Sequence, residues 1–435
     1  MLSRKKDTDY LALSARIHAM EGRLLSRDRM DRMIDAREES EALKVITECG
    51  YGGAEGLRTQ DVERVLAAAR AETLRELSAA APDPRVVDVF RLKYDYHNAK
   101  VLVKAEAMGI DAGRLLLDGG RVPASELAEG YQKEQLGGLS PRFQSAIREA
   151  RETLAASHDP QLSDLALDRA CYEEMAQLAQ ETGSAFLQGY VRLAVDVANL
   201  RAAVRVARIG KGSEFLSQVL LPGGSVSQRT LVAARGEELN ALFQSGALAQ
   251  AAELGAKAAR PAGGSLTAFE RECDNALTRY LGDARRVPFG VETVIAYLYA
   301  KEAELTAIRT ILAGRRAGLD GAVIRERLRG WMEMYRIAVI GDPDSVLGFK
   351  ALGLEVCPAE DVEQARQAIH RMAKENYAIL YLTEQLAAQL QPEIARYQDA
   401  LTPAIILIPG KEGSLGIGMA NVTNAVERAV GADIL

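Results

Sequence analysis

The sequence repeats one pattern of charges three times, with a period of about 100 residues. In each copy an acidic residue is followed five positions later by a basic residue and fourteen positions later by a glycine. The acids are Asp95, Asp196 and Glu304, the bases are Lys100, Arg201 and Arg309, and the glycines are Gly109, Gly210 and Gly318. A helical unit of this length is too long for the common solenoids. We therefore predict three similar helical modules that close around a shared centre with pseudo-threefold symmetry.

Longer segments support a duplication. The stretch LLLDGGRVPASEL (115–127) matches VLLPGGSVSQRTL (219–231), and LDRACYEEM (167–175) matches FERECDNAL (269–277). Asn98 and Asn199 also correspond, whereas the third copy has Ala307. Cys171 and Cys273 fall at equivalent positions of the second match, so we attribute their spacing to duplication rather than to a disulfide.

The repeated acid and base point to different sides of a helix. Residues five positions apart lie about 140° apart around the helix axis, so each base is free to reach another helix. One interpretation is that these charges only brace neighbouring helices, as most helical charges do. The other is that like residues of the three modules converge on a centre and contact a partner. The sequence leaves both interpretations open.

Composition and charge exclude several classes of protein. The 435 residues carry a formal net charge of -6 and are 48% hydrophobic, and such an acidic chain is not expected to bind nucleic acid. No uninterrupted apolar stretch approaches the length of a membrane span, so we expect no direct membrane insertion. The four cysteines are far apart and lack metal-ligand spacing, which indicates a reducing compartment.

The periodicity changes near Trp331. From residue 8 to about 329 the sequence predicts helix after helix, beginning with the apolar stripe from Tyr10 to Leu24 behind a possible Thr8 cap. Beyond it, four apolar runs alternate with helical segments, which predicts βαβ units and a parallel sheet. The expected strands are 335–340, 354–358, 377–382 and 404–408, and the expected helices are 344–353, 361–374, 384–397 and one from about 419.

These patterns predict a multidomain protein. Residues 1–330 would form an all-α part of three pseudo-repeated modules, and residues 331–435 a small α/β domain with a receiver-like or Rossmann-like parallel sheet.

The glycine-rich segment IPGKEGSLGIG (408–418) outlines a phosphate-binding loop but departs from it at the decisive position. A Walker-type loop requires Ser or Thr after Gly-Lys, whereas Glu412 follows Lys411 here. The first strand leads into Gly341-Asp342-Pro343, whose carboxylate would repel a phosphate. We therefore expect the glycines to form a tight turn toward the last helix, and we identify no catalytic residue, cofactor site or metal site in the sequence.

A phosphorelay receiver domain is the stronger alternative. Asp342, Asp344 and Lys411 imitate the acids and the lysine of such domains. The acceptor aspartate is expected at the end of the third strand, where Thr383 and Glu384 stand instead. The two acids are then better explained as residues that cap a helix start. A regulatory scaffold with a degenerate receiver domain remains the alternative function.

Long collinear motifs resemble components of the V-type and A-type rotary ATPases. DYLALSARIHAMEGRLLS, LKYDYHNAKVLVKAEAMG and RVPFGVETVIAYLYAKEAELTAIR are similar to the C subunit, the homologue of the eukaryotic d subunit. YRIAVIGDPDSVLGFKALGLEV and IPGKEGSLGIGM are similar to the F subunit. These two are normally separate chains, and here they are joined near Met332 to Met334.

The resemblance implies a role without catalysis. It predicts a helical funnel of three modules that sits on the membrane rotor ring and accepts the foot of the central shaft, which is the D subunit, and a small α/β domain bound to that shaft. The catalytic head would be a further partner, and the complex would lie on the cytoplasmic face of the membrane. The funnel positions would be Asp95, Lys100, Asp196, Arg201, Glu304 and Arg309, and the terminal helix with Asn421, Asn424 and Arg428 would contact the shaft.

Overall fold

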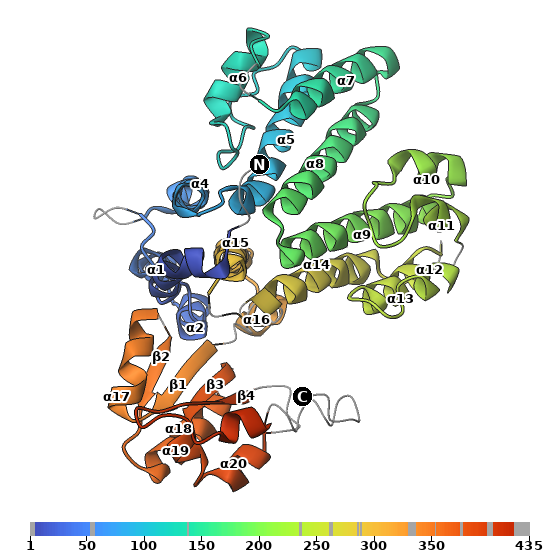
Figure 1. Ribbon diagram of the computed structural model, residues 1–435. Helices are drawn as coiled ribbons and strands as arrows, with labels where there is room; N and C mark the ends of the chain where they lie inside the picture. Colours follow the sequence, from blue (N-terminus) through green and yellow to red (C-terminus); the bar gives the residue numbers. More distant parts are fainter. Residues whose placement is uncertain are drawn as a thin grey trace.

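The structure is a computed structural model (Figure 1) that describes residues 5–52, 57–136, 139–234, 237–260, 264–284, 287, 289–328, 336–352, 354–374, 377–397 and 403–421. Helices make up the first part of the chain, up to Leu328. Their bounds are η1 (Asp7–Tyr10), α1 (Leu11–Glu21), α2 (Arg27–Asp35), α3 (Glu39–Glu48), η2 (Thr59–Asp61), α4 (Val62–Ala80), α5 (Arg85–Met108), α6 (Ala124–Gln132), α7 (Pro141–Ser157), α8 (Pro160–Thr182), α9 (Ala185–Arg208), α10 (Ser213–Val219), α11 (Gln228–Ala233), α12 (Glu237–Ala241), α13 (Ala249–Ala258), α14 (Leu266–Asp283), α15 (Val291–Arg316) and α16 (Gly321–Leu328).

The helices form three modules, as the repeat predicts (Figure 1). Module 2 comprises α5–α8 and module 3 comprises α9–α14. Module 3 has an apolar core of its own, whereas the core of module 2 is continuous with the centre where the modules meet. Module 1 is assembled from two distant parts of the chain, because residues 25–66 share a core with residues 305–328. Helices α2 and α3, near the start of the helical part, therefore pack against α15 and α16 at its end.

Each module contains one of the three long helices α5, α9 and α15, and all three end in the same way. The repeated glycines Gly109, Gly210 and Gly318 adopt positive φ angles of 64°, 70° and 67°. The next residue in each case donates its N–H to a carbonyl five positions back, which is the Schellman ending of a helix. Glycine is favoured here because a side chain is strained in the left-handed region. The glycine of the repeat therefore marks the end of a module's long helix.

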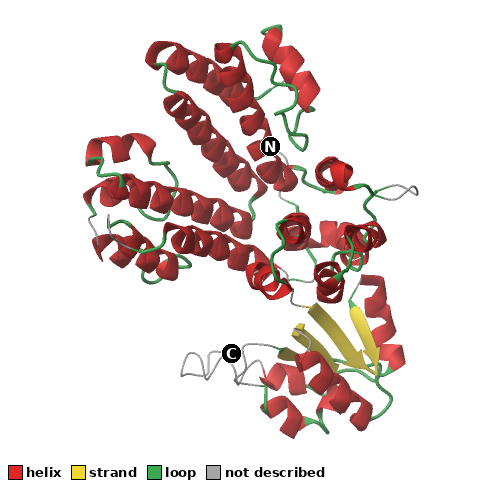
Figure 2. Ribbon diagram, turned by 180° about the vertical axis from the view of Figure 1, so that it is seen from behind, coloured by secondary structure: helices red, strands yellow, loops and turns green. Residues whose placement is uncertain are grey.

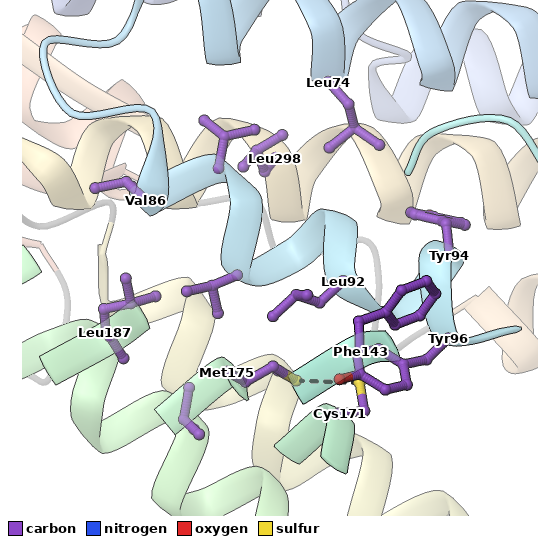
Figure 3. Close-up of a cluster of buried hydrophobic side chains, with 14 of the residues drawn as sticks. Leu74, Val86, Leu92, Tyr94, Tyr96, Phe143, Cys171, Met175, Leu187 and Leu298 are labelled. Atoms are coloured by element: carbon purple, nitrogen blue, oxygen red, sulfur yellow. Dashed lines mark hydrogen bonds between the residues drawn. The ribbon is translucent and has the colours of Figure 1, made fainter. Parts of the chain in front are cut away.

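The first halves of the long helices meet in one apolar centre. Figure 3 shows Leu74 of α4, Val86 of α5, Leu187 of α9 and Leu298 of α15 in this cluster. All four are at most 4% exposed. Residues of α14 and of the N-terminal helix α1, such as Leu281 and Ile17, belong to the same cluster. The modules thus radiate from a common core, which Figure 2 shows from the opposite side.

A four-stranded parallel sheet follows, with the strand order β2-β1-β3-β4. The strands are β1 (Arg336–Gly341), β2 (Glu355–Pro358), β3 (Tyr377–Thr383) and β4 (Ala404–Ile408), which confirms the predicted strands and their parallel pairing. Helices α18 (Val362–Lys374), α19 (Glu384–Ala387) and α20 (Gln391–Ala395) share the core of one face, and α17 (Pro343–Val346) with η5 (Leu347–Leu352) covers the other. The segment η5 also contacts α1 of the helical part.

Three predicted elements are wrong in detail. The single helix expected over 384–397 is two short helices, because the second starts anew with Pro392 in its first turn. The helix expected over 344–353 is mostly the 3₁₀ segment η5. Thr8 caps no helix, since it lies inside η1 and α1 begins after Tyr10. The predicted domain boundary at 330/331 falls in residues 329–335, outside the described residues, and stays a prediction.

Candidate functional site

The three repeated acids are buried and perform the same local task. Asp95, Asp196 and Glu304 are 2%, 4% and 3% exposed. Each carboxylate accepts a backbone N–H from a loop of its own module, namely that of Val122 (3.4 Å), Ser225 (2.8 Å) or Leu25 (2.8 Å). In modules 2 and 3 this loop contains the glycine pair of the matched segments, which is Gly119-Gly120 in module 2 and Gly223-Gly224 in module 3. The acids therefore fasten a loop of the same module to each long helix.

The loops leave no room for a side chain beside the acids. A Cβ atom on Gly120 would lie 2.2 Å from Oδ1 of Asp95, and one on Gly224 would lie 2.3 Å from Oδ1 of Asp196. These distances explain why the second glycine is kept in both copies of the segment, and the first, Gly119 or Gly223, has a positive φ angle.

The matched asparagines fix the same loops. The Asn98 side chain donates to the carbonyl of Leu117 and accepts from its N–H, both at 2.8 Å. Asn199 makes the same pair of bonds with Leu221, at 2.9 Å and 2.7 Å. The acid and the asparagine thus act together on one helix face, whereas Ala307 in module 1 makes no such bond.

The three bases pair with acids on neighbouring helices, which confirms the predicted direction of these side chains. Lys100 lies 2.6 Å from Asp168 on α8, and Arg201 lies 2.7 Å from Glu270 on α14. Arg309 lies 2.8 Å from Glu63 on α4. Asp168 and Glu270 are themselves equivalent in the matched segments. The ion pair between the long helix and its neighbour was therefore duplicated with the module. The exposed fractions of the three basic side chains are 21%, 24% and 29%.

Module 2 contains a buried ionic network that sequence reasoning missed. Arg121 bridges Asp95 and Glu174, at 2.9 Å from each, and the Tyr96 hydroxyl donates to Glu174 at 2.8 Å. Burial raises the pKa of the Asp95 carboxyl, although the Arg121 guanidinium opposes the shift. The duplication offers a signal that could have revealed the network: Tyr96, Arg121 and Glu174 are replaced together by Val197, Ser225 and Ala276 in module 3.

In module 1 the buried acid is also paired, and its partners come from both chain segments of the module. Glu304 of α15 accepts a hydrogen bond from the Tyr51 hydroxyl and lies 2.8 Å from Lys301. Burial, with the charge of Glu304 next in effect, raises the pKa of Tyr51 far above its ordinary value, so the phenol stays a donor. The acid of this copy therefore joins the two ends of the helical part.

The carboxyl end of the sheet is closed by internal contacts. Asp342 caps α17 by accepting the N–H of Ser345 at 3.1 Å, as predicted, and Lys411 lies 2.8 Å from Asp344. Thr383, in the place of a receiver's acceptor aspartate, is fully buried. The lysine that imitates a receiver's lysine thus forms its close ion pair with Asp344 and lies 3.9 Å from Asp342.

Glu384 holds the glycine loop. Its carboxylate accepts the N–H of Leu415, the N–H of Gly418 at 2.7 Å and the hydroxyl of Ser414 at 2.9 Å. These donors, the Gly418 N–H above all, lower the pKa of the Glu384 carboxyl. Gly413 and Gly416 have positive φ, so the glycines form the tight turn that the sequence predicts.

The turn leads into helical residues 417–421, where Asn421 is partly buried. Asn424 and Arg428 lie outside the described residues. Whether any of the nine predicted contact residues touches a partner stays a prediction. Within the described ranges, no helix is both long and apolar enough to cross a membrane, and no three His, Cys, Asp or Glu side chains are placed to hold a metal ion.

Comparison with known proteins divides the chain in the same two parts. The family model of the ATP synthase (C/AC39) subunit matches residues 13–327, and that of the ATP synthase (F/14-kDa) subunit matches residues 337–426.

Curated relatives agree with these matches. The second part is 52% identical to the F subunit of the V-type ATP synthase of Fusobacterium nucleatum over 102 residues, which are 23% of this chain and 97% of that relative. The first part is 25% identical to the C subunit of the V-type sodium ATPase of Enterococcus hirae over 326 residues, which are 74% of this chain and 98% of that relative. It is also 26% identical to the C subunit of the V-type ATP synthase of Thermus thermophilus over 329 residues, again 74% of this chain and 98% of that relative. The chain therefore belongs to the ATP synthase (C/AC39) subunit family and continues into a member of the ATP synthase (F/14-kDa) subunit family.

Proposed function

We propose that this chain is a non-catalytic rotor component of the central stalk of a V-type or A-type ATPase/synthase. It would link the shaft, formed by the D subunit, to the membrane rotor ring and couple ATP hydrolysis or synthesis in the catalytic head to proton or sodium transport. The chain would then lie on the cytoplasmic face of the membrane as a peripheral part of that complex. We also propose that residues 1–330 and 331–435 are its two domains.

One observation carries this proposal: three modules radiate from one apolar centre, which is continuous with the core of module 2, and the chain continues into a sheet domain with a core of its own. A part that transmits torque requires stiff helices and broad contact surfaces. The long helices α5, α9 and α15 supply the first, and the buried acids and ion pairs fix the loops and neighbouring helices to them.

The experiment mixes the purified full chain with the shaft protein and the ring protein of its own host and weighs the complexes by native mass spectrometry. We expect complexes of the chain with the shaft protein and with the ring protein, in which its two parts are present in equal numbers because they are covalently joined. A chain that binds neither protein, while its circular dichroism shows folded helices, contradicts the proposal. Recovery with a sensor kinase instead would favour the regulatory scaffold, and tight ATP binding in calorimetry would favour an enzyme.

The predicted contact residues have a separate test. The acids are too deeply buried to meet a partner directly, so we propose that they position the loops and that the bases offer the contact surface. A triple variant, K100Q/R201Q/R309Q, should reduce recovery of the shaft or ring protein more than the matched variant R142Q, whose arginine is exposed on α7. Equal recovery of both variants would assign the bases to bracing alone. Asn421, Asn424 and Arg428 remain proposed shaft contacts.

A further inference from the structure

A cavity of about 120 Å³ lies where helices of all three modules meet. Its walls come from α4, α5, α9, α14 and α15. Figure 3 labels three of its residues, Leu74, Tyr94 and Leu298, which come from three of these helices. The volume approaches that of an apolar cavity known to hold one benzene ring, about 150 Å³. The position and size suit a small ligand rather than a polypeptide segment.

One side of the cavity holds two cations that share a single carboxylate. Arg70 Nη1 and Lys93 Nζ each lie 3.9 Å from the Glu302 carboxylate. These separations are too long for hydrogen bonds, and the bond that Glu302 does accept, at 2.9 Å, comes from the Tyr94 hydroxyl. The third cation of the wall, Lys301, is already paired with Glu304 at 2.8 Å. The remaining charges at the cavity therefore sum to one net positive charge.

Arg70 has donor capacity that the protein does not use. Its side chain is 15% exposed, and its Nε atom is buried without a hydrogen-bond partner among the described residues. Its guanidinium lies 5.3 Å from the centre of the Tyr94 ring, and Nη1 is 3.5 Å from the Tyr94 oxygen. A buried donor without an acceptor is unfavourable. An anion in the cavity would supply the acceptor.

The rest of the wall is apolar and aromatic. Phe90 of α5 and Tyr190 of α9 stack with ring centres 5.1 Å apart, and leucines of α4, α14 and α15 complete the surface. Small-molecule sites combine such a predominantly apolar wall with a few polar groups that fix orientation. Here the charged groups are three cations and the Glu302 carboxylate, and the whole cavity is close in volume to a single ring.

We propose that this cavity binds a small monocarboxylate that has an aromatic or branched apolar body. Its carboxylate would lie against Arg70 and Lys93, and its body against Phe90 and Tyr190. Because the walls belong to all three modules, an occupied cavity would join the modules at their centre and stabilise the helical part against unfolding. The inference concerns the cavity alone and does not depend on the proposed rotor function.

Benzoate is the probe, added to the purified full chain and measured by calorimetry and by the melting temperature. We expect saturable binding on the order of 1 mM or tighter, with a rise in melting temperature. Benzyl alcohol, which keeps the ring and loses the charge, should bind at least about tenfold more weakly, and benzylamine more weakly still. Absence of saturable benzoate binding, or equal binding of benzylamine, overturns the proposal.

Variants of opposite sign locate the site. R70Q should weaken benzoate binding at least about tenfold, whereas E302Q should strengthen it, because the competing carboxylate is gone. The matched control is R75Q, whose arginine lies on the same helix α4 with its side chain 72% exposed. K93Q repeats the test should R70Q fail to fold. Weakening by R75Q equal to that by R70Q, or weaker binding by a folded E302Q, would place benzoate elsewhere and refute the assignment.

Discussion

Removal of Arg121 should expose the cost of the buried network in module 2. In R121S, Asp95 and Glu174 each lose a charge-assisted hydrogen bond of 2.9 Å, and these two residues are only 2% and 5% exposed. Each such bond contributes about 1.5–3 kcal/mol, and loss of the cation from a buried pair costs about 3–5 kcal/mol. We expect the free energy of unfolding to fall by about 3–5 kcal/mol. Serine stands at the equivalent position 225 of module 3, where it donates to Asp196.

A second substitution, E174Q, is expected to change stability in opposite directions with and without Arg121. E174Q alone should destabilise the protein by roughly 1–3 kcal/mol, because it weakens the bond from Arg121. In the R121S background the same change should stabilise it by about 1–2 kcal/mol, because it removes a buried charge that has lost its cation while it keeps an acceptor for Tyr96.

The pH dependence provides an independent check. Asp95 has a raised pKa in the folded state, so its contribution to stability is greatest at low pH and is lost as the pH rises through that pKa. Without Arg121 the pKa should rise further. The difference between R121S and the parent should therefore be smaller near about pH 5 than near about pH 8.

Urea unfolding, followed by helical circular dichroism and by hydrogen exchange in α5 and α8, measures these differences. The control is R142S in the same module, where an exposed pair with Glu173 predicts a loss below about 1 kcal/mol. Equal losses in R121S and R142S, or a double variant less stable than R121S, would refute the reasoning.

Two further predictions test the loops. G224A should destabilise the protein by about 1.5–3 kcal/mol, because its Cβ atom would displace the loop from Asp196. G212A has open space around it but lies at the N-cap of α10, so it should cost no more than about 1 kcal/mol. Equal losses of stability in the two variants would contradict this. E384A should speed tryptic cleavage after Lys411 by about tenfold, because the glycine loop loses its acceptor. The control E360A, at an exposed position, should leave the cleavage rate unchanged, and mass spectrometry of the fragments distinguishes the outcomes.

The sequence predicted the parts of the fold that periodicity and duplication determine. The strands around Val339 and Leu380 are buried on both faces, which makes them continuous apolar runs that are easy to recognise. The repeated glycines reported helix ends, because their positive φ is a local requirement. The break between α19 and α20 could also have been predicted from Pro392, because proline lacks the N–H that a continuous helix requires.

The rest depended on contacts between distant residues. The repeat could not show that Glu304 would meet Leu25 and Tyr51, which precede it by more than two hundred positions. Nor does helical periodicity give any information about Arg121, which lies in a loop before α6. An arginine in a loop is usually solvated, whereas Arg121 pairs with two buried acids. The cavity beside Arg70 is likewise formed by five helices, so no pattern within a single segment of sequence predicts it.

The shared core of residues 25–66 and 305–328 has a consequence for synthesis on the ribosome. Module 3 is continuous in sequence and has its own core, so it is able to fold soon after it leaves the exit tunnel, whereas the core of module 2 is completed only when α15 joins it. Module 1 must wait, with its first helices already made, until the end of α15 and α16 emerges. A nascent chain that stalls before residue 305 would therefore expose Met33 and Ile46, which are fully buried in the finished protein, to chaperones and proteases.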